Sequence, residues 1–248
     1  MRRFGLIGRD ISYSFSPGYF KSKFDALGLA DCSYEIFDLP EIDKFPEILS
    51  EKHLSGLNVT IPYKTAICPF LDHLDADAAE IGAVNTIRFT KAGLEGYNTD
   101  LIGFMNSLRP LLLPTDKAAL ILGAGGAARA IAFGLTKLGI HYRFVSRSPG
   151  KEKLSYGELD GNVLKNFQIL INCTPLGTYP QVHAAPPIPY KALTKYHLLY
   201  DLIYNPELTT FLQSGQKAGT RIKNGLEMLH LQAEASWEIW NRGEGFRL

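Results

Sequence analysis

The sequence predicts an α/β protein with a mostly parallel sheet, and two features of its hydrophobic pattern lead to this prediction. The first is a series of short apolar or alternating runs, typical of strands, at residues 4–7, 34–39 and 56–61. The second is helical spacing in the segments between them, as in residues 19–27, which end at Gly28. Because strands that alternate with helices are joined by crossover connections, the strands are expected to run mostly parallel.

The rest of the chain continues the pattern and indicates a second series of elements. Residues 84–97 are typical of a hairpin with a glycine-bearing loop, and a helix is expected from about Thr99 to Leu108. Positions 110–117 contain prolines, which interrupt helices and strands, and polar residues, as in a linker. A second strand and helix series begins at Ala118. Apolar residues keep helical period from Leu226 to Trp240, so this last helix must cover an apolar surface.

The charge balance argues against two classes of partner. The chain has 26 Lys and Arg residues against 25 Asp and Glu residues. No basic run forms a stripe that would follow a nucleic-acid backbone or an anionic membrane. No stretch approaches the roughly 20 apolar residues of a membrane span. We therefore expect a small-molecule substrate, and neither nucleic acid nor a membrane as partner.

The cysteines indicate a reducing compartment. Cys32, Cys68 and Cys173 are odd in number and lie too far apart for the spacing of a metal site or a redox pair. We expect no bound metal and a cytoplasmic location. A monomer and a homodimer both remain open.

A glycine-rich turn after Ala118–Leu122 predicts a dinucleotide site. The turn, Gly123-Ala124-Gly125-Gly126-Ala127-Ala128, has the pattern G-x-G-x-x-A between a strand and a helix. The first glycine permits the tight turn, the second lets the backbone approach a pyrophosphate, and the small Ala128 lets the helix pack closely on the strand. The helix N-terminus would then bind the pyrophosphate through its free N–H groups.

The end of the next strand favours NADP over NAD. It reads Val145-Ser146-Arg147-Ser148, and no acidic residue that could bind a ribose hydroxyl occurs between Gly139 and Lys151. The Arg147 guanidinium suits a 2'-phosphate, and Ser146 and Ser148 can add hydroxyl donors. Lys151 is a weaker second candidate. The alternative for Arg147 is a solvated loop residue.

Four polar clusters beside strands indicate the function more specifically than the glycine turn does. They are Ser14-Phe15-Ser16-Pro17, Asn58-Val59-Thr60-Ile61-Pro62-Tyr63-Lys64, Gly82-Ala83-Val84-Asn85-Thr86 and Asn98-Thr99-Asp100. Later segments are Asn172-Cys173-Thr174-Pro175-Leu176-Gly177, Tyr200-Asp201-Leu202-Ile203-Tyr204 and Asn224-Gly225-Leu226-Glu227-Met228-Leu229 with Gln232. In this order and spacing the chain resembles the shikimate dehydrogenase family over almost its whole length.

The resemblance implies an α/β fold of two domains. Residues 1–99 would form the substrate-binding and catalytic domain, completed by the C-terminal helix within residues 225–248. Residues 100–224 would form a Rossmann-type NADP-binding domain. The implied reaction is the reversible reduction of 3-dehydroshikimate to shikimate by NADPH, an oxidoreductase step of aromatic amino acid (chorismate) biosynthesis.

The resemblance also implies roles for individual residues. Ser14, Ser16 and Thr60 would bind the substrate carboxylate, which Tyr204 would approach, and Asn85, Asp100 and Gln232 would hold ring hydroxyls. Asn58 belongs to the same set of short polar side chains suited to a hydroxylated ring. The implied cofactor contacts are Gly123, Ala124, Gly125, Gly126, Ala127, Ser146, Arg147, Ser148, Lys151, Thr174, Gly225 and Met228. Taken alone, Ser14–Pro17 could equally be a helix cap or a turn.

Lys64 and Asp100 are the expected catalytic residues. Hydride transfer to a ketone leaves negative charge on oxygen, so an acid/base group should contact that atom. Lys64 fills this role, and Asp100 should orient it. Whether Lys64 transfers the proton or chiefly stabilises charge stays open.

The chain departs from the family pattern after Ser148. Only 20 residues separate it from the strand at Ile169, and Gly150, Gly157 and Gly161 interrupt them, so a short strand and a loop or turn of helix should replace the usual full helix. Glu227 stands where a smaller residue is common. Two alternatives remain open: a quinate/shikimate dehydrogenase that uses NAD, and a non-catalytic NADP-binding regulator on the same fold.

Overall fold

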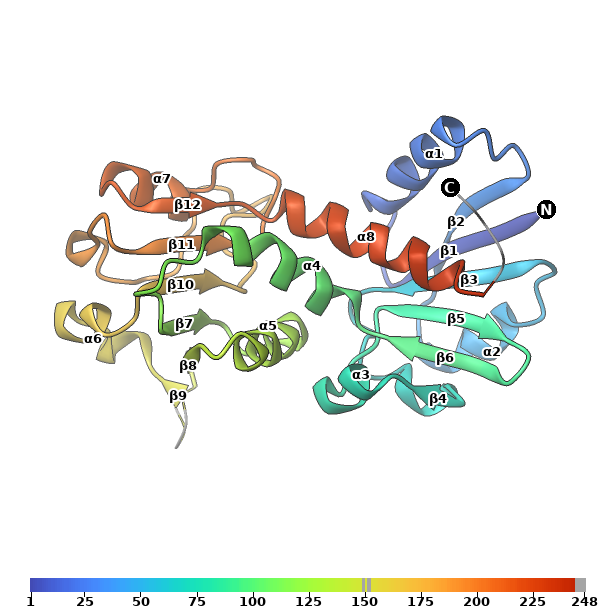
Figure 1. Ribbon diagram of the computed structural model, residues 1–248, viewed down its shortest axis with the longest axis horizontal. Helices are drawn as coiled ribbons and strands as arrows, with labels where there is room; N and C mark the ends of the chain where they lie inside the picture. Colours follow the sequence, from blue (N-terminus) through green and yellow to red (C-terminus); the bar gives the residue numbers. More distant parts are fainter. Residues whose placement is uncertain (149, 151–152, 244–248) are drawn as a thin grey trace. The chain divides into compact units, whose positions relative to one another are not determined.

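The computed structural model describes residues 1–148, 150 and 153–243, and the chain divides into two compact units (Figure 1). Unit 1 comprises Met1–Thr99 and the C-terminal segment from Ala233, and unit 2 comprises Asp100–Gln232. The boundary in the C-terminal region lies inside the last helix, α8 (Leu226–Trp240), whereas the predicted domain boundary lies just before it. Lys151, a predicted cofactor contact, lies outside the described residues.

Unit 1 contains a mixed sheet, sheet A, with strand order β2-β1-β3-β5-β6-β4. Its strands are β1 (Arg2–Gly8), β2 (Cys32–Asp38), β3 (Leu54–Val59), β4 (His73–Leu74), β5 (Thr86–Thr90) and β6 (Gly93–Tyr97). Its helices, besides part of α8, are α1 (Ser16–Ala26), α2 (Phe45–Ile48) and α3 (Ala76–Ile81). β1 pairs in parallel with β2 and β3, and β5 forms the predicted antiparallel hairpin with β6.

The two faces of sheet A carry different helices because successive strand residues point to opposite faces. Phe4 of β1 packs with Phe20 of α1 and Trp240 of α8 in one buried aromatic cluster. Ile7, three residues further along β1, packs on the other face in a cluster that includes Phe45 of α2. Within unit 1, the C-terminal part of α8 therefore packs on sheet A and contributes to the apolar core.

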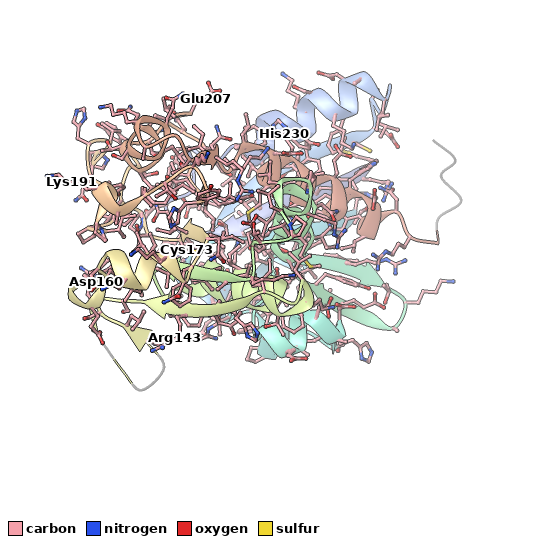
Figure 2. All side chains as sticks on the ribbon, turned by 60° about the vertical axis from the view of Figure 1, so that its left-hand side comes forward. Arg143, Asp160, Cys173, Lys191, Glu207 and His230 are labelled. Atoms are coloured by element: carbon pink, nitrogen blue, oxygen red, sulfur yellow. The ribbon has the colours of Figure 1, made fainter. Side chains whose placement is uncertain are left out.

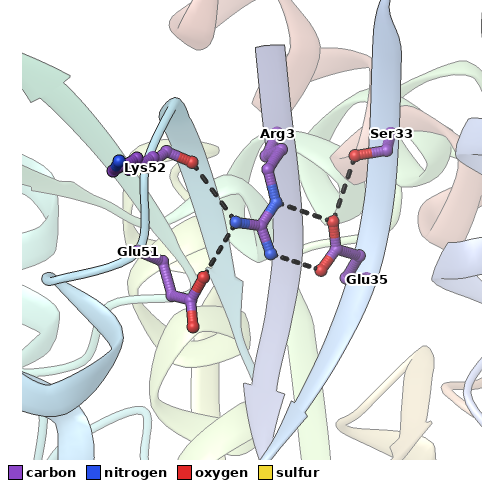
Figure 3. A network of polar contacts seen from close by, with 5 residues as sticks. All are labelled: Arg3, Ser33, Glu35, Glu51 and Lys52. Atoms are coloured by element: carbon purple, nitrogen blue, oxygen red, sulfur yellow. Dashed lines mark hydrogen bonds and ion pairs between the residues drawn. The ribbon is translucent and has the colours of Figure 1, made fainter. Parts of the chain in front are cut away.

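An ion-pair network fastens the edge strand β2 to β1 (Figure 3). Arg3 of β1 donates through Nε and Nη2 to the two carboxylate oxygens of Glu35 on β2, at 2.8 and 2.7 Å. Its Nη1 donates to Glu51 at 2.9 Å and to the backbone carbonyl of Lys52 at 3.3 Å. The bidentate geometry is directional, so it helps to set the pairing of β1, whose carboxyl end leads into the Ser14 segment.

Unit 2 contains a parallel sheet, sheet B, with strand order β12-β11-β10-β7-β8-β9. Its strands are β7 (Ala118–Leu122), β8 (His141–Val145), β9 (Lys153–Leu154), β10 (Ile169–Asn172), β11 (Leu198–Asp201) and β12 (Arg221–Lys223). The helices that pack here are α4 (Thr99–Leu108), α5 (Gly126–Lys137), α6 (Gly161–Lys165), α7 (Thr210–Lys217) and the first part of α8. The predicted α/β fold is confirmed in both units.

Helices cover both faces of sheet B, and small residues let three of them approach closely. α4 and α5 pack on one face, and α6 and α7 pack on the other. A Cβ atom on Gly103 of α4 would lie 2.5 Å from the backbone oxygen of Met228 on α8. A Cβ atom on Gly134 of α5 would lie 2.9 Å from the ring of Phe104. None of the helices in the described part of the chain is long and apolar enough to cross a membrane.

The connection after β8 is short, as the sequence predicts. Its described residues form the two-residue strand β9, a 3₁₀ turn at Tyr156–Glu158 and the five-residue helix α6. Glu158 and Ser155 cap the 3₁₀ turn reciprocally, and Asp160 caps α6. Capped single turns thus replace the full helix of a longer crossover.

Candidate functional site

The predicted substrate residues of unit 1 gather where β1 and β3 end. Thr60 follows β3, and its N–H donates to the backbone oxygen of Ile7 on β1 at 2.8 Å. Lys64 lies in the following turn, where its backbone oxygen accepts from Val84 at 2.7 Å. The next residue, Asn85, accepts from the N–H of Val59 at 2.9 Å. Backbone hydrogen bonds therefore hold the Thr60, Lys64 and Asn85 segments together, at the strand edge where ligands bind in open α/β sheets.

Ser14 and Ser16 lie at the start of α1, after the loop that follows β1. The N–H of Ser16 donates to Ser14 Oγ at 3.4 Å, and Pro17 occupies the first turn of the helix. The helix has Phe15 as its N-cap residue, without a side-chain hydrogen bond to the cap among the described residues. Ser14 therefore makes a local turn contact, and both serines remain partly exposed.

Asn58 lies in a buried polar network rather than facing solvent. Its Nδ2 donates to the backbone oxygen of Asn85, to Thr86 Oγ1 and to Ser236 Oγ, at 3.1, 3.2 and 3.0 Å. Its Oδ1 accepts from the Tyr34 hydroxyl at 2.8 Å. Asn58 is 6% exposed, so its amide holds the Asn85 and Thr86 segment from inside the protein core. Direct contact with a substrate hydroxyl stays a prediction for this residue.

The polar network around Asn58 extends to other segments of unit 1. Burial raises the pKa of Tyr34, and a hydrogen bond with Ser16 opposes that rise. Asn85 Oδ1 accepts from the N–H of Thr99, the first residue of α4, at 2.7 Å. Ser236 Oγ lies 2.8 Å from Thr86 Oγ1 and 3.2 Å from Thr99 Oγ1. Within unit 1, one set of polar side chains thus connects α1, β5, Thr99 and the C-terminal part of α8.

The glycine turn of unit 2 fits a dinucleotide. Gly123 has φ +105°, a conformation that favours glycine. At Gly125 and Gly126 an added Cβ atom would meet no other described heavy atom within 4 Å, apart from immediate chain neighbours and the helix backbone, so the space beside the turn is open. In the described residues, the N-terminus of α5 has neither a side-chain cap nor an acidic first turn. This end of a 12-residue helix is suited to a pyrophosphate.

The Thr174 segment lies against this turn. A Cβ atom on Gly123 would lie 3.1 Å from Thr174 Cγ2 and 3.3 Å from the backbone oxygen of Cys173. Thr174 is held by Asn172, whose Oδ1 accepts from the backbone N–H of Thr174 at 3.0 Å and from its Oγ1 at 2.6 Å. Burial raises the pKa of the Cys173 thiol, and the charge of Asp201 raises it further. Cys173, labelled in Figure 2, is therefore a neutral side chain beside the apolar core.

The predicted 2'-phosphate residues directly follow β8. Arg147 and Ser148 are exposed, and the N–H of Ser148 donates to Ser146 Oγ at 3.3 Å. Burial raises the pKa of Tyr156, and the positive charge of Arg147 opposes that rise. Arg147 is therefore close enough to Tyr156, in the trimmed crossover, for their charges to interact.

The predicted residues around α8 have different surroundings. A Cβ atom on Gly225 would lie 2.1 Å from the backbone oxygen of Leu202, so only glycine fits there. Met228 is buried in the core of unit 2, and Gln232 Nε2 donates to the backbone oxygen of Leu229 at 2.9 Å. Glu227 forms an ion pair with Lys223 of β12.

The predicted residues fall into two groups by unit. Unit 1 holds Ser14, Ser16, Asn58, Thr60, Lys64 and Asn85, and unit 2 holds Asp100, Tyr204, Gln232 and the described cofactor candidates. Asp100 is buried in the first turn of α4. In the described residues, no group of three or more His, Cys, Asp or Glu side chains could hold a metal ion.

The sequence reasoning missed the buried residues that hold these segments, above all Ser236, Asn172 and Asp201. Asn172 and Asp201 belong to segments that carry the family resemblance, but the sequence alone indicates no role for them. A polar residue at the end of an otherwise apolar strand was the available signal. Asp201 is fully buried, and burial raises its pKa to about 6 although hydrogen bonds from Thr209, Ile203 and Asn172 oppose the rise.

The chain is similar to proteins of one family over nearly its whole length. A family model described as the shikimate dehydrogenase substrate binding domain matches residues 6–87. A relative from Methanococcus maripaludis, named shikimate dehydrogenase (NADP(+)), is 40% identical over 253 residues, with 95% of this chain and 90% of the relative covered.

Solved structures of the same family are similar in fold. The shikimate dehydrogenase from Aquifex aeolicus has a TM-score of 0.86 and 32% identity, covering 97% of this chain and 92% of its own. The shikimate 5-dehydrogenase from Thermus thermophilus was solved in complex with NADP(H) and shikimate. It has a TM-score of 0.85 and 32% identity, covering 97% of this chain and 93% of its own.

We expect Asp201 to make the free energy of unfolding fall as the pH rises from 5 to 8. Its pKa is 3.8 in its usual environment and about 6 in the folded protein. The folded state therefore binds the proton more tightly, so the stabilisation is fully present below about pH 4 and is lost as the pH rises through 6. For these pKa values the loss between pH 5 and pH 8 is on the order of 1 kcal/mol.

Urea unfolding followed by circular dichroism at pH 5 and pH 8 would measure this effect in the unmodified protein and in Asp201→Asn. The amide does not titrate, and the other titrating groups are common to both proteins. The difference between their pH dependences therefore isolates Asp201. Equal pH dependences would contradict the raised pKa.

Proposed function

This chain belongs to the shikimate dehydrogenase family, and we propose that it catalyses the reversible reduction of 3-dehydroshikimate to shikimate with NADPH, a step of aromatic amino acid (chorismate) biosynthesis. The family predicted from the sequence motifs is confirmed. The observation that carries the proposal is the gathering of Thr60, Lys64 and Asn85 at the carboxyl ends of parallel strands, in a chain whose other unit carries an open glycine turn.

In this proposal the polar residues of unit 1 bind the substrate. Ser14, Ser16 and Thr60 donate hydroxyl hydrogens to the carboxylate, and Asn85 holds a ring hydroxyl. Asn58 keeps the Asn85 segment in place, since its Nδ2 donates to the Asn85 backbone oxygen. For Asp100, Tyr204 and Gln232 of unit 2 we propose the substrate contacts that the family pattern implies.

Lys64 is the proposed acid/base residue. When bound, NADPH supplies the hydride. Reduction of the ketone places negative charge on its oxygen, which an ammonium group stabilises and can protonate. The N–H of Val84 donates to the backbone oxygen of Lys64, so the Lys64 side chain starts from a fixed position in the turn that follows β3. In the reverse reaction the neutral amine would accept the hydroxyl proton.

The proposed NADP site consists of residues from four segments of unit 2. The glycine turn Gly123–Ala127 would bind the pyrophosphate, and Ser146, Arg147 and Ser148 would bind the 2'-phosphate. Thr174, Gly225 and Met228 complete the set on the side of β10 and α8. The curated relative is NADP-dependent, in agreement with the exposed Arg147 at the end of β8.

We further propose a cytoplasmic monomer or homodimer that acts on small molecules, without nucleic acid. In the described structure Cys32, Cys68 and Cys173 are free thiols, which fits a reducing compartment. The net charge of +1 supports the absence of a nucleic-acid partner.

Turnover of NADPH with 3-dehydroshikimate, followed by absorbance, tests the proposal. We expect NADPH oxidation that depends on 3-dehydroshikimate, and a higher kcat/KM for shikimate with NADP than for quinate with NAD in the reverse direction. A preference for quinate and NAD would support the quinate/shikimate branch. Binding of NADPH without turnover would support a regulator.

Lys64→Ala should lower kcat by about 100-fold or more, which is typical of lost acid/base catalysis. The KM values should change less, because the serines and amides that bind the substrate remain. Steady-state kinetics would measure both constants, with Lys21→Ala, an exposed lysine of α1, as the control. An unchanged kcat in Lys64→Ala would exclude its catalytic role.

Arg147→Ala should raise the KM for NADPH by about 10-fold or more, because a charge-assisted hydrogen bond to phosphate contributes roughly 1.5–3 kcal/mol. The KM for NADH, which has no 2'-phosphate, should change little. Arg143→Ala is the matched control, since Arg143 is also exposed on β8 and is labelled in Figure 2. An equal effect on both cofactors would mean that Arg147 does not recognise the 2'-phosphate.

A further inference from the structure

We propose that Asp201 is a positioning residue for the dinucleotide, because it holds in place the two loop segments that carry Thr174 and Gly225. This inference rests on the proposed NADP-binding function. Asp201 is the last residue of β11 and is fully buried. It would therefore act on the dinucleotide through its neighbours rather than by direct contact.

The link to Thr174 runs through Asn172, on the adjacent strand β10. Asn172 Nδ2 donates to Asp201 Oδ1 at 3.0 Å. This bond, together with a longer one from Nδ2 to the backbone oxygen of Leu176 at 3.3 Å, sets which end of the Asn172 amide faces Thr174, because Oδ1 then turns toward the two donors of Thr174. Thr174 in turn packs against the first glycine of the turn. Rotation of the Asn172 amide would withdraw the acceptor that holds Thr174.

The link to Gly225 runs through Ile203. The N–H of Ile203 donates to Asp201 Oδ1 at 3.1 Å, and the backbone oxygen of Ile203 accepts from the N–H of Gly225 at 3.0 Å. Gly225 directly precedes α8 and lies against the backbone of Leu202. The position of this predicted cofactor contact therefore depends on the turn that Asp201 holds.

The other carboxylate oxygen of Asp201 is held by α7. Thr209, the N-cap residue of that helix, donates from Oγ1 to Asp201 Oδ2 at 2.6 Å. Asp201 therefore accepts hydrogen bonds at both carboxylate oxygens, and these bonds orient it. All three donors are neutral, so no ion pair contributes to this orientation. A side chain with an acceptor at the Oδ1 position should retain the contacts to Asn172 and Ile203, and an alanine cannot.

Fluorescence titration with NADPH tests the proposal on the full-length chain. We expect Asp201→Ala to raise the Kd for NADPH about tenfold or more, and Asp201→Asn to stay within about threefold of the unmodified protein, since the amide oxygen can accept both bonds. Asn172→Ala, which removes the holder of Thr174 directly, should raise the Kd similarly. The double variant Asp201→Ala/Asn172→Ala should be less than additive, because both act through one chain of contacts.

Tyr200→Phe is the matched control. Tyr200 is the preceding residue of β11, and its hydroxyl lies 2.6 Å from Ser107 Oγ in the core of the same unit. This variant also loses a buried hydrogen bond, but its Kd for NADPH should not change. A Kd that rises equally in Tyr200→Phe would mean that general loss of stability, rather than positioning, weakens binding.

The outcomes separate this proposal from the proposed function. If the unmodified protein does not bind NADPH, the proposed function fails. If it binds NADPH and Asn172→Ala binds equally well, the positioning role of Asp201 is overturned, whether or not Asp201→Ala folds. Failure of Asp201→Asn to rescue the affinity lost in Asp201→Ala would also overturn it.

Discussion

Buried polar side chains must find hydrogen-bond partners, and this constraint shapes the functional segments of both units. In unit 1 the amide of Asn58 satisfies this need by joining Tyr34, Thr86 and Ser236. In unit 2 the carboxylate of Asp201 does so by joining Asn172, Ile203 and Thr209. Each of these side chains lies at or near the carboxyl end of a parallel strand. These buried strand residues consequently hold the loops that begin at the strand ends.

Strand alternation explains why these side chains face the elements that they hold. Leu57 and Val59 of β3 point into the apolar cluster on one face of sheet A, so Asn58 between them points to the opposite face, toward Ser236 of α8. On β11 the same alternation directs Tyr200 into the cluster with α4 and α5. Asp201 then turns to the side where α7 begins.

Local patterns allowed part of this structure to be predicted, and long-range contacts account for most of what was missed. The hairpin at β5 and β6, the glycine turn at Gly123 and the helix from Thr99 depend on residues close in sequence, so periodicity and glycine chemistry reveal them. The contact between Asn58 and Ser236 joins residues 178 positions apart, and no local pattern indicates it. The sequence alone consequently predicts a substrate contact for Asn58, and the structure adds that both of its amide hydrogens face protein acceptors. The roles of the more accessible polar residues, such as the partly exposed Ser16 and the exposed Arg147, remain predictions.

The two sides of the proposed NADP site differ in how firmly the structure holds their residues. On the side of the short crossover after β8, Arg147 and Ser148 are exposed, and a capped 3₁₀ turn with Tyr156 replaces a full helix. Exposed charges are screened by water and salt more strongly than buried ones. On the side of β10 and β11, by contrast, Asn172 and Asp201 are completely buried and hold their loops through short hydrogen bonds. In the proposed NADP site the Thr174 and Gly225 segments are therefore fixed before binding, and a loop fixed before binding loses little entropy when the ligand arrives.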